Sequence, residues 1–188
     1  MAVEWVIAAG VLVGASAVLW GFSTWMTRRI EAAVPGNGRF VDVEGERFHY
    51  YEEGEGPPLV MIHGLMGSSR NLTYALSGRL REHFRVITLD RPGSGYSTRH
   101  TGTPADLPAQ ARQIAAFINT LGLHKPLVLG HSLGGAIALA LALDHPHAVS
   151  GLILVAPLTH PQRLLPLVFL SLAVRPAWLR RWMAHTLT

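Results

Sequence analysis

The sequence contains no cysteine and only one lysine, Lys125, and both absences narrow what the protein can be. Without cysteine there are no disulfide bonds, thiolate metal sites or cysteine nucleophiles. The other basic residues are arginines, but no tract of five or more basic residues occurs, so we expect no nucleic-acid binding. No cofactor and no metal are expected. Of the 188 residues, 49% are hydrophobic and 15% charged, which predicts one globular domain rather than two.

Charged residues are also absent between Trp5 and Thr27. This uncharged segment is about as long as a helix that spans a bilayer, which needs roughly 20 apolar residues. We therefore predict a transmembrane anchor over residues 1–27, followed by a linker over residues 28–39. A cleaved signal peptide is the alternative, because Ala15-Ser16-Ala17 resembles a cleavage site. The anchor is favoured, since no basic residue precedes the apolar segment as it does in signal peptides.

The residues that flank and interrupt this segment suggest its orientation and packing. Arg28 and Arg29 follow it directly, and basic residues are enriched on the cytoplasmic side of membrane helices. The protein is therefore expected in the cell membrane as a single-pass protein, with its soluble domain in the cytoplasm. Gly10 and Gly14 have the spacing found in some helix dimers, but we favour packing without dimerisation.

The rest of the chain alternates between strand-like and helix-like segments. An alternating pattern around Glu44-Gly45 predicts an antiparallel hairpin. Short apolar runs typical of strands buried on both faces then recur at 58–64, 85–90, 126–130 and 150–156. Stretches with helical spacing separate these runs. The pattern predicts an α/β fold with a mostly parallel sheet and helices on both faces.

Three loops with chemically suggestive residues follow three of these apolar runs. They read HGLMG from His63, DRPGSGYS from Asp90 and GHSLGG from Gly130. Ligands bind beyond the carboxyl ends of parallel strands, so the loops are expected to lie together. Glycines around Ser132 permit a strained turn that exposes its hydroxyl group. Each motif also has an ordinary structural interpretation; His63, for example, is equally consistent with a buried histidine whose hydrogen bonds are satisfied.

In this order the three motifs resemble the α/β-hydrolase superfamily, in its branch of serine esterases, perhydrolases and C–C bond hydrolases. The resemblance implies that Ser132 is the nucleophile and that the backbone N–H groups of Leu65 and Leu133 form an oxyanion hole. It also implies that Asp90 supports its loop rather than acting in catalysis. Relatives that open epoxides or remove halides carry aspartate at the turn, so Ser132 favours attack on a small-molecule ester or related acyl or carbonyl group.

The remaining members of a catalytic triad are harder to find. The resemblance places an acid and then a histidine after Ser132, but Asp144 is the only carboxylate residue there, and a predicted helix separates the two. His160 follows an apolar run on the same sheet edge and is a weak candidate for the histidine. We expect His131 to point away from Ser132 and to pack beneath the loop.

The last part of the chain, residues 162–188, resembles the start of the cap that covers the substrate pocket in this family. We therefore expect residues 40–161 to be a partial core, with the C-terminal strands missing and the chain truncated within the cap. Such a chain would have little or no activity of its own. The alternatives to a serine hydrolase are a binding module without catalysis and an inert domain on a membrane anchor.

Overall fold

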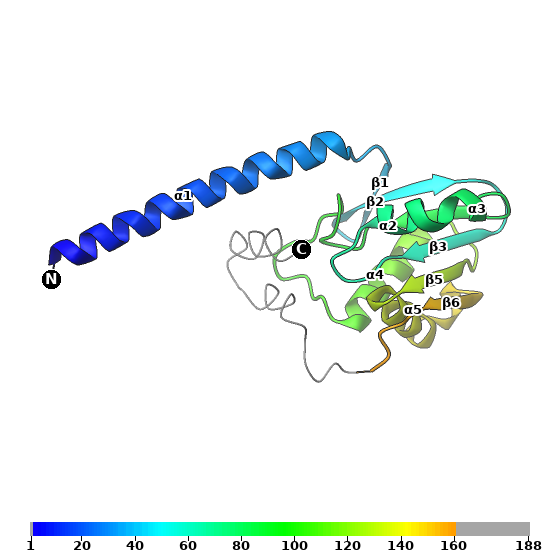
Figure 1. Ribbon diagram of the computed structural model, residues 1–188. Helices are drawn as coiled ribbons and strands as arrows, with labels where there is room; N and C mark the ends of the chain where they lie inside the picture. The colour runs from blue at the N-terminus through cyan, green and yellow to red at the C-terminus, as the bar shows by residue number, and fades with distance from the viewer. Residues whose placement is uncertain (1, 161–188) are drawn as a thin grey trace. The chain divides into compact units, whose positions relative to one another are not determined.

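The computed structural model describes residues 2–160, and the predicted cap at 162–188 lies outside this range (Figure 1). The described residues belong to two units, one ending at Pro35 and the other beginning at Gly36. The first contains helix α1, Ala2–Ala33. Its segment Gly10–Ala33 has a mean hydropathy of 1.2 and is not buried. By length and composition alone this helix is able to cross a membrane, a property that signal sequences share.

Helix α1 continues beyond the charged pair at Arg28 and Arg29. It ends at Ala33, and the first strand begins at Arg39. The non-helical connection is therefore limited to residues 34–38, which is shorter than the linker expected from the sequence.

The second unit is built on one six-stranded sheet with the order β1-β2-β4-β3-β5-β6. The first two strands are antiparallel to their neighbours, and the other pairs are parallel. The strands are β1 Arg39–Val43, β2 Glu46–Glu53, β3 Pro58–Ile62, β4 Arg85–Leu89, β5 Leu127–His131 and β6 Gly151–Val155. The predicted hairpin is confirmed: Glu44 and Gly45 connect β1 to β2 with positive φ angles of 48° and 84°, as a tight two-residue turn requires.

Helices cover both faces of this sheet, as predicted (Figure 1). They are α2 Ser69–Leu72, η1 Thr73–Ser77, α3 Gly78–Leu80, α4 Leu107–Thr120, α5 Leu133–Asp144 and η2 Pro146–Ala148. Because strand side chains alternate, β3 places Leu59 and Met61 against the segment α2–η1–α3, and Val60 and Ile62 against α4 and α5. The two faces are therefore buried by different helices, which explains the unbroken apolar runs.

Strand β6 is one of the two edge strands among those that the structure describes, and β1 is the other. The β6 side chains Ile153, Leu154 and Val155 remain 37–41% exposed, whereas the side chains of β3 from Leu59 to Ile62 are fully buried. The apolar sequence of β6 thus fits a strand covered on both faces better than the partly exposed position that it has among the described residues.

We expect Phe117→Ala to destabilise the second unit by about 3 to 5 kcal/mol. Phe117 is fully buried on α4, and its ring centroid lies 5.2 Å from that of Phe48 and 5.5 Å from that of Tyr50. Leu143→Ala is the matched control, because Leu143 is 79% exposed, and it should change stability by less than about 0.5 kcal/mol. Urea titration of the detergent-solubilised chain measures both, and equal losses would contradict the packing.

Candidate active site

Ser132 occupies a strained turn between a strand and a helix. Strand β5 ends at His131 and helix α5 begins at Leu133, and Ser132 between them has φ 53° and ψ −117°. Residues other than glycine rarely adopt positive φ, and such strain persists only where the surroundings hold it. Here the Ser132 N–H donates to the Val155 carbonyl at 3.0 Å, and the Ser132 carbonyl accepts from the Leu158 N–H at 2.9 Å. These contacts hold the turn from the neighbouring strand.

The glycines around Ser132 are required by close packing. A Cβ atom at Gly134 would lie 2.2 Å from the carbonyl oxygen of Ile62, at the end of β3. A Cβ atom at Gly130 would lie 2.4 Å from the carbonyl oxygen of Gly134. Any larger residue would therefore push the first turn of α5 away from the sheet. The spacing of the GHSLGG motif thus follows from how tightly α5 begins against β3.

The loop after β3 lies against the turn that carries Ser132. A Cβ atom at Gly64 would be 3.1 Å from the Cβ atom of Ser132 and 3.2 Å from Nδ1 of His131. Leu65 follows Gly64 directly, so the structure brings together the two loops that contain Ser132, Leu65 and Leu133. All three of these residues are partly buried.

His63 is a buried residue with both ring nitrogens occupied. Its Nδ1 lies 2.8 Å from the Gly64 carbonyl oxygen, which only accepts, so Nδ1 carries the proton. Its Nε2 accepts a hydrogen bond from the Arg91 backbone N–H at 3.0 Å. Burial, and after it the positive charge of Arg91, lowers the pKa of His63 from 6.5 to about 4. Of the functional and structural interpretations of His63, these contacts favour the structural one, a buried histidine whose hydrogen bonds are satisfied.

Arg91 is a residue that the sequence analysis did not single out, and it organises the same loop. Its side chain is 5% exposed. It donates from Nε to the His63 carbonyl at 3.0 Å, from Nη2 to the Gly64 carbonyl at 2.9 Å and from Nη1 to Gln110 Oε1 at 2.8 Å. Burial lowers the pKa of Arg91 to about 10, so it remains charged at neutral pH. The position of Arg91 in the DRPGSGYS motif was the sequence feature that could have identified it as part of the site.

Asp90 is buried and accepts hydrogen bonds from three segments. Its carboxylate accepts from the Ser69 N–H at 2.6 Å and the Tyr96 N–H at 3.1 Å, and it lies 2.7 Å from Nδ1 of His49. A Cβ atom at Gly95 would lie 2.2 Å from this carboxylate, so the turn closes tightly around it. These contacts match the supporting role expected for Asp90.

The candidate partners after Ser132 are not assembled around it in residues 133–160. Asp144 is exposed at the other end of α5, whose twelve residues span about 18 Å. His160 is exposed, and its Nδ1 lies 2.9 Å from the Thr159 hydroxyl. His131 is also exposed, so the expectation that it packs beneath the loop was wrong. His131 is the last residue of β5, at the carboxyl end of a strand that lies between β3 and β6, and the described residues leave its side chain exposed there.

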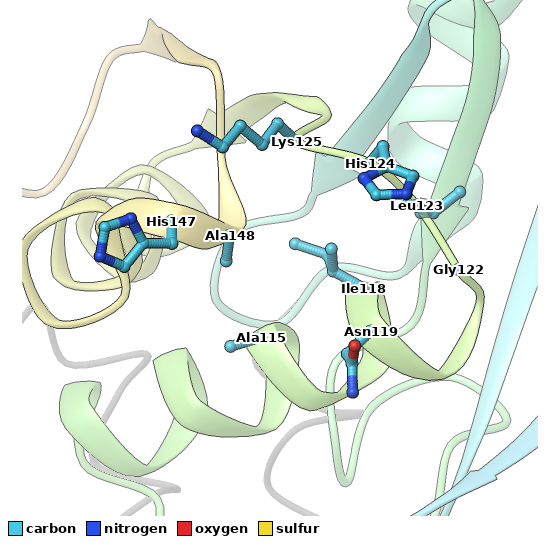
Figure 2. Close-up of a pocket in the computed structure, with 9 residues that line it drawn as sticks. All are labelled: Ala115, Ile118, Asn119, Gly122, Leu123, His124, Lys125, His147 and Ala148. Carbon is cyan, nitrogen blue, oxygen red and sulfur yellow. The ribbon is translucent and has the colours of Figure 1, made fainter.

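A hollow with a volume of about 380 Å³ lies at the opposite edge of the sheet. It is lined by Ala115, Ile118, Asn119, Gly122, Leu123, His124, Lys125, His147 and Ala148. Figure 2 shows Ala115 and Ile118 of α4 facing Ala148. Strand β5 begins two residues after Lys125 and ends at the Ser132 turn. This hollow is therefore separate from the candidate active site.

A parallel sheet with a strained strand–serine–helix turn defines the class of α/β hydrolases. The chain belongs to this family, because a family model described as alpha/beta hydrolase fold matches residues 57–187. The fold predicted from the sequence is thereby confirmed.

Curated relatives include several hydrolases. The chain is 38% identical to 2-hydroxymuconate semialdehyde hydrolase of Pseudomonas putida over 64% of this chain and 43% of the relative. It is 34% identical to haloalkane dehalogenase 2 of Mycobacterium tuberculosis over 64% and 42%, respectively. It is 37% identical to pimeloyl-[acyl-carrier protein] methyl ester esterase of Aeromonas salmonicida over 62% and 42%. The chain thus spans about two fifths of the length of these relatives.

Solved structures with a similar fold include a membrane protein. A membrane phospholipase A, described as a bacterial virulence factor, has a TM-score of 0.64 and 26% identity, covering 98% of this chain and 67% of that chain. A variant of a meta-cleavage product hydrolase has a TM-score of 0.61 and 26% identity, covering 65% and 46%.

The depressed pKa of His63 predicts that the domain loses stability in mild acid. The unfolded chain takes up a proton at this residue as the pH falls through 6.5, whereas the folded chain does so only near 4. Stability present above pH 6.5 is therefore lost as the pH falls to 4, by up to about 3 kcal/mol. Urea titrations at several pH values measure this loss.

His63→Gln is the control for this pH dependence. Glutamine does not titrate, and its Oε1 is able to accept from the Arg91 N–H in place of Nε2. The variant should show a clearly smaller loss of stability between pH 6.5 and 4. An unchanged slope in the variant would show that another group titrates in this range.

Proposed function

We propose that this chain is a membrane-anchored serine hydrolase domain that acts on an ester or related acyl bond. Ser132 attacks the substrate carbonyl carbon, and the backbone N–H groups of Leu65 and Leu133 bind the resulting oxyanion. The observation that carries this proposal is the strained geometry of Ser132, with φ 53°, at a turn against which Gly64 packs. Strain of this kind at a polar residue is typical of functional sites.

The proposed oxyanion hole uses groups that the fold already orients. Leu133 begins α5, so its N–H belongs to the first turn of a helix, where the positive end of the dipole favours an anion. Arg91 binds the carbonyls of His63 and Gly64, which restricts the peptide groups leading to Leu65. Each oxyanion donor typically contributes about 3 to 4 kcal/mol to transition-state stabilisation. The site therefore has a preorganised electrostatic component independent of the general base.

The identity of residue 132, a serine at the turn between β5 and α5, helps to distinguish among the reactions of the relatives. The serine oxygen adds to the acyl carbon and expels the alcohol of the ester, which leaves an acyl-serine. Water then attacks the acyl carbon, so that the carboxylic acid is released and the serine hydroxyl is restored, which completes hydrolysis. In the family, halide displacement is associated with aspartate at this position, so Ser132 favours the esterase-like chemistry over that of the dehalogenase relative. The similarity to a methyl ester esterase and to a phospholipase supports an acyl substrate.

Helix α1 supplies the proposed anchor, with the domain from Phe40 onward on the cytoplasmic side. Its apolar segment is long enough for a bilayer, and the similarity to a membrane phospholipase A extends over 98% of the chain. Arg28 and Arg29 directly follow the uncharged segment, at the end that leads into the domain. Basic residues at that end favour a cytoplasmic location for the domain. We propose that the chain crosses the membrane once and that Gly10 and Gly14 do not mediate dimerisation.

A fluorophosphonate probe should label Ser132 selectively, because the oxyanion hole also stabilises the attack on phosphorus. Labelling should be slow, since loss of a triad member typically costs on the order of 10⁴ to 10⁶ in rate and residues 133–160 offer Ser132 no assembled histidine–carboxylate pair. Peptide mass spectrometry of the full chain measures the site. Ser132→Ala should abolish labelling, and Ser150→Ala, at an exposed serine, should leave it unchanged.

Absence of labelling at Ser132 would favour a binding module without catalysis. Turnover of p-nitrophenyl butyrate is the second measurement, and we expect little from the purified chain. Rapid turnover that disappears in Ser132→Ala would show that a general base is present. His160→Ala would then test whether His160 is that base.

The chain expressed in bacteria should sediment with membranes and resist carbonate extraction. A variant without residues 1–33 should leave the membrane fraction, since it lacks the apolar helix. Protease added to spheroplasts should spare the domain if it is cytoplasmic. Digestion while a cytoplasmic marker stays intact would show the opposite orientation, and a shortened N-terminus by mass spectrometry would show a signal peptide.

A further inference from the structure

A second hollow, here called the Arg70 hollow, lies beside the end of β2 and the segment α2–η1. Its volume is about 570 Å³. It is lined by Tyr51, Ser68, Arg70, Asn71, Thr73 and Tyr74. Neither Ser132 nor Leu65 is among these described lining residues, so the hollow is distinct from the proposed catalytic site.

The lining of the Arg70 hollow is rich in hydrogen-bond donors. The Arg70 guanidinium lies 5.7 Å from the centroid of the Tyr51 ring, and its Nη2 donates to Asn37 Oδ1 at 3.3 Å. Asn71 uses its Oδ1 to accept from the Ser68 N–H at 2.8 Å, which leaves the amide NH₂ to donate elsewhere. A guanidinium fork beside an amide NH₂ group suits the oxygen atoms of a phosphate group, whereas the Tyr51 and Thr73 hydroxyls already donate to Asn37 Oδ1 and to the Ser69 carbonyl.

The rim of the hollow has an aromatic residue in an unusual position. Tyr74 is 98% exposed, which is rare for so large a side chain on a soluble surface. Tyrosine is enriched where membrane and water meet, because its ring is apolar and its hydroxyl is polar. An arginine next to an exposed tyrosine is therefore suited to the headgroup layer of a bilayer.

Chain connectivity limits how far this hollow lies from the end of α1. Asn37 contacts two residues that line the hollow, because its Oδ1 accepts from both Arg70 and the Tyr51 hydroxyl, each at 3.3 Å. Helix α1 ends at Ala33. Four residues span at most about 14 Å even when fully extended. If α1 crosses the membrane, Asn37 is held within that distance of the end of the helix at Ala33, which lies little more than one helical turn beyond Arg28 and Arg29.

We propose that the Arg70 hollow binds the phosphate of a phospholipid headgroup in the leaflet from which α1 emerges. The inference rests on the proposed anchoring and adds to it a specific contact between the domain and the membrane surface. This contact would restrict the rotation of the domain about its short connection. The ligand is membrane lipid rather than soluble phosphate, because the short connection keeps lipid headgroups at a high local concentration.

The absence of cysteine allows a direct test in the full chain. Tyr74→Cys is labelled with the fluorophore NBD and the chain is reconstituted in nanodiscs that contain phosphatidylglycerol. Leu143→Cys is the control, because Leu143 is 79% exposed and lies near the end of α5. Lipids spin-labelled at the headgroup should quench the label at position 74 strongly and the label at position 143 weakly.

A second substitution tests the role of the guanidinium. In the Tyr74→Cys background, Arg70→Gln should lower the ratio of docked to undocked domain by about fivefold, the effect of one arginine at an anionic membrane surface. Arg79→Gln is the matched control, because Arg79 is an exposed arginine on α3 that does not line the hollow, and it should leave the quenching unchanged.

The outcomes separate this inference from the proposed anchoring. Equal quenching at positions 74 and 143 in a chain retained by the nanodiscs would overturn the headgroup site and leave the anchor standing. Loss of the chain from the nanodiscs would overturn both. A response of the label at position 74 to inorganic phosphate in detergent, without quenching in nanodiscs, would overturn the lipid assignment in favour of a soluble phosphate.

Discussion

The buried guanidinium of Arg91 is the interaction on which the geometry of the site most depends. It joins the loop after β3, the turn after β4 and helix α4 through hydrogen bonds to His63, Gly64 and Gln110. Charge-assisted bonds of this kind contribute about 1.5 to 3 kcal/mol each, and the Gly64 carbonyl accepts a further hydrogen bond from Nδ1 of His63. The loop that packs against Ser132 is thus held in place by the buried Arg91 guanidinium.

Two tight contacts complete the support of the strained turn. The first is the approach of α5 to the end of β3, where Gly134 has no room for a side chain beside the Ile62 carbonyl. The second is the closure of the turn after β4 around the carboxylate of Asp90, which also binds the Ser69 N–H. Both contacts bring loops from neighbouring strands to the same edge of the sheet. The strain at Ser132 is therefore balanced by packing and hydrogen bonds outside the turn.

Much of the fold followed from local patterns in the sequence. Each apolar run became a strand, because short runs dominated by apolar residues fit strands of a parallel sheet whose faces are covered by helices. Glu44-Gly45 became the hairpin turn, since glycine tolerates positive φ. His131 was misjudged, because whether a residue at a strand end is covered depends on layers contributed by distant segments. Helix α1 continues to Ala33, past the end of the uncharged segment, because arginine is a good helix former and does not terminate a helix.

Local sequence patterns were thus enough to identify the succession of strands and helices along the chain. They also identified the glycine-flanked turn at Ser132 and the uncharged segment of α1. These features depend on backbone sterics and on hydrophobic periodicity, which act over a few residues. Only the tertiary structure decided that His63 carries its proton on Nδ1, that Arg91 binds residues 27 and 28 positions before it and 19 positions after it, and that Asn37 reaches Arg70. Such contacts join groups that are far apart in the chain, and their partners are set by the order and packing of the strands.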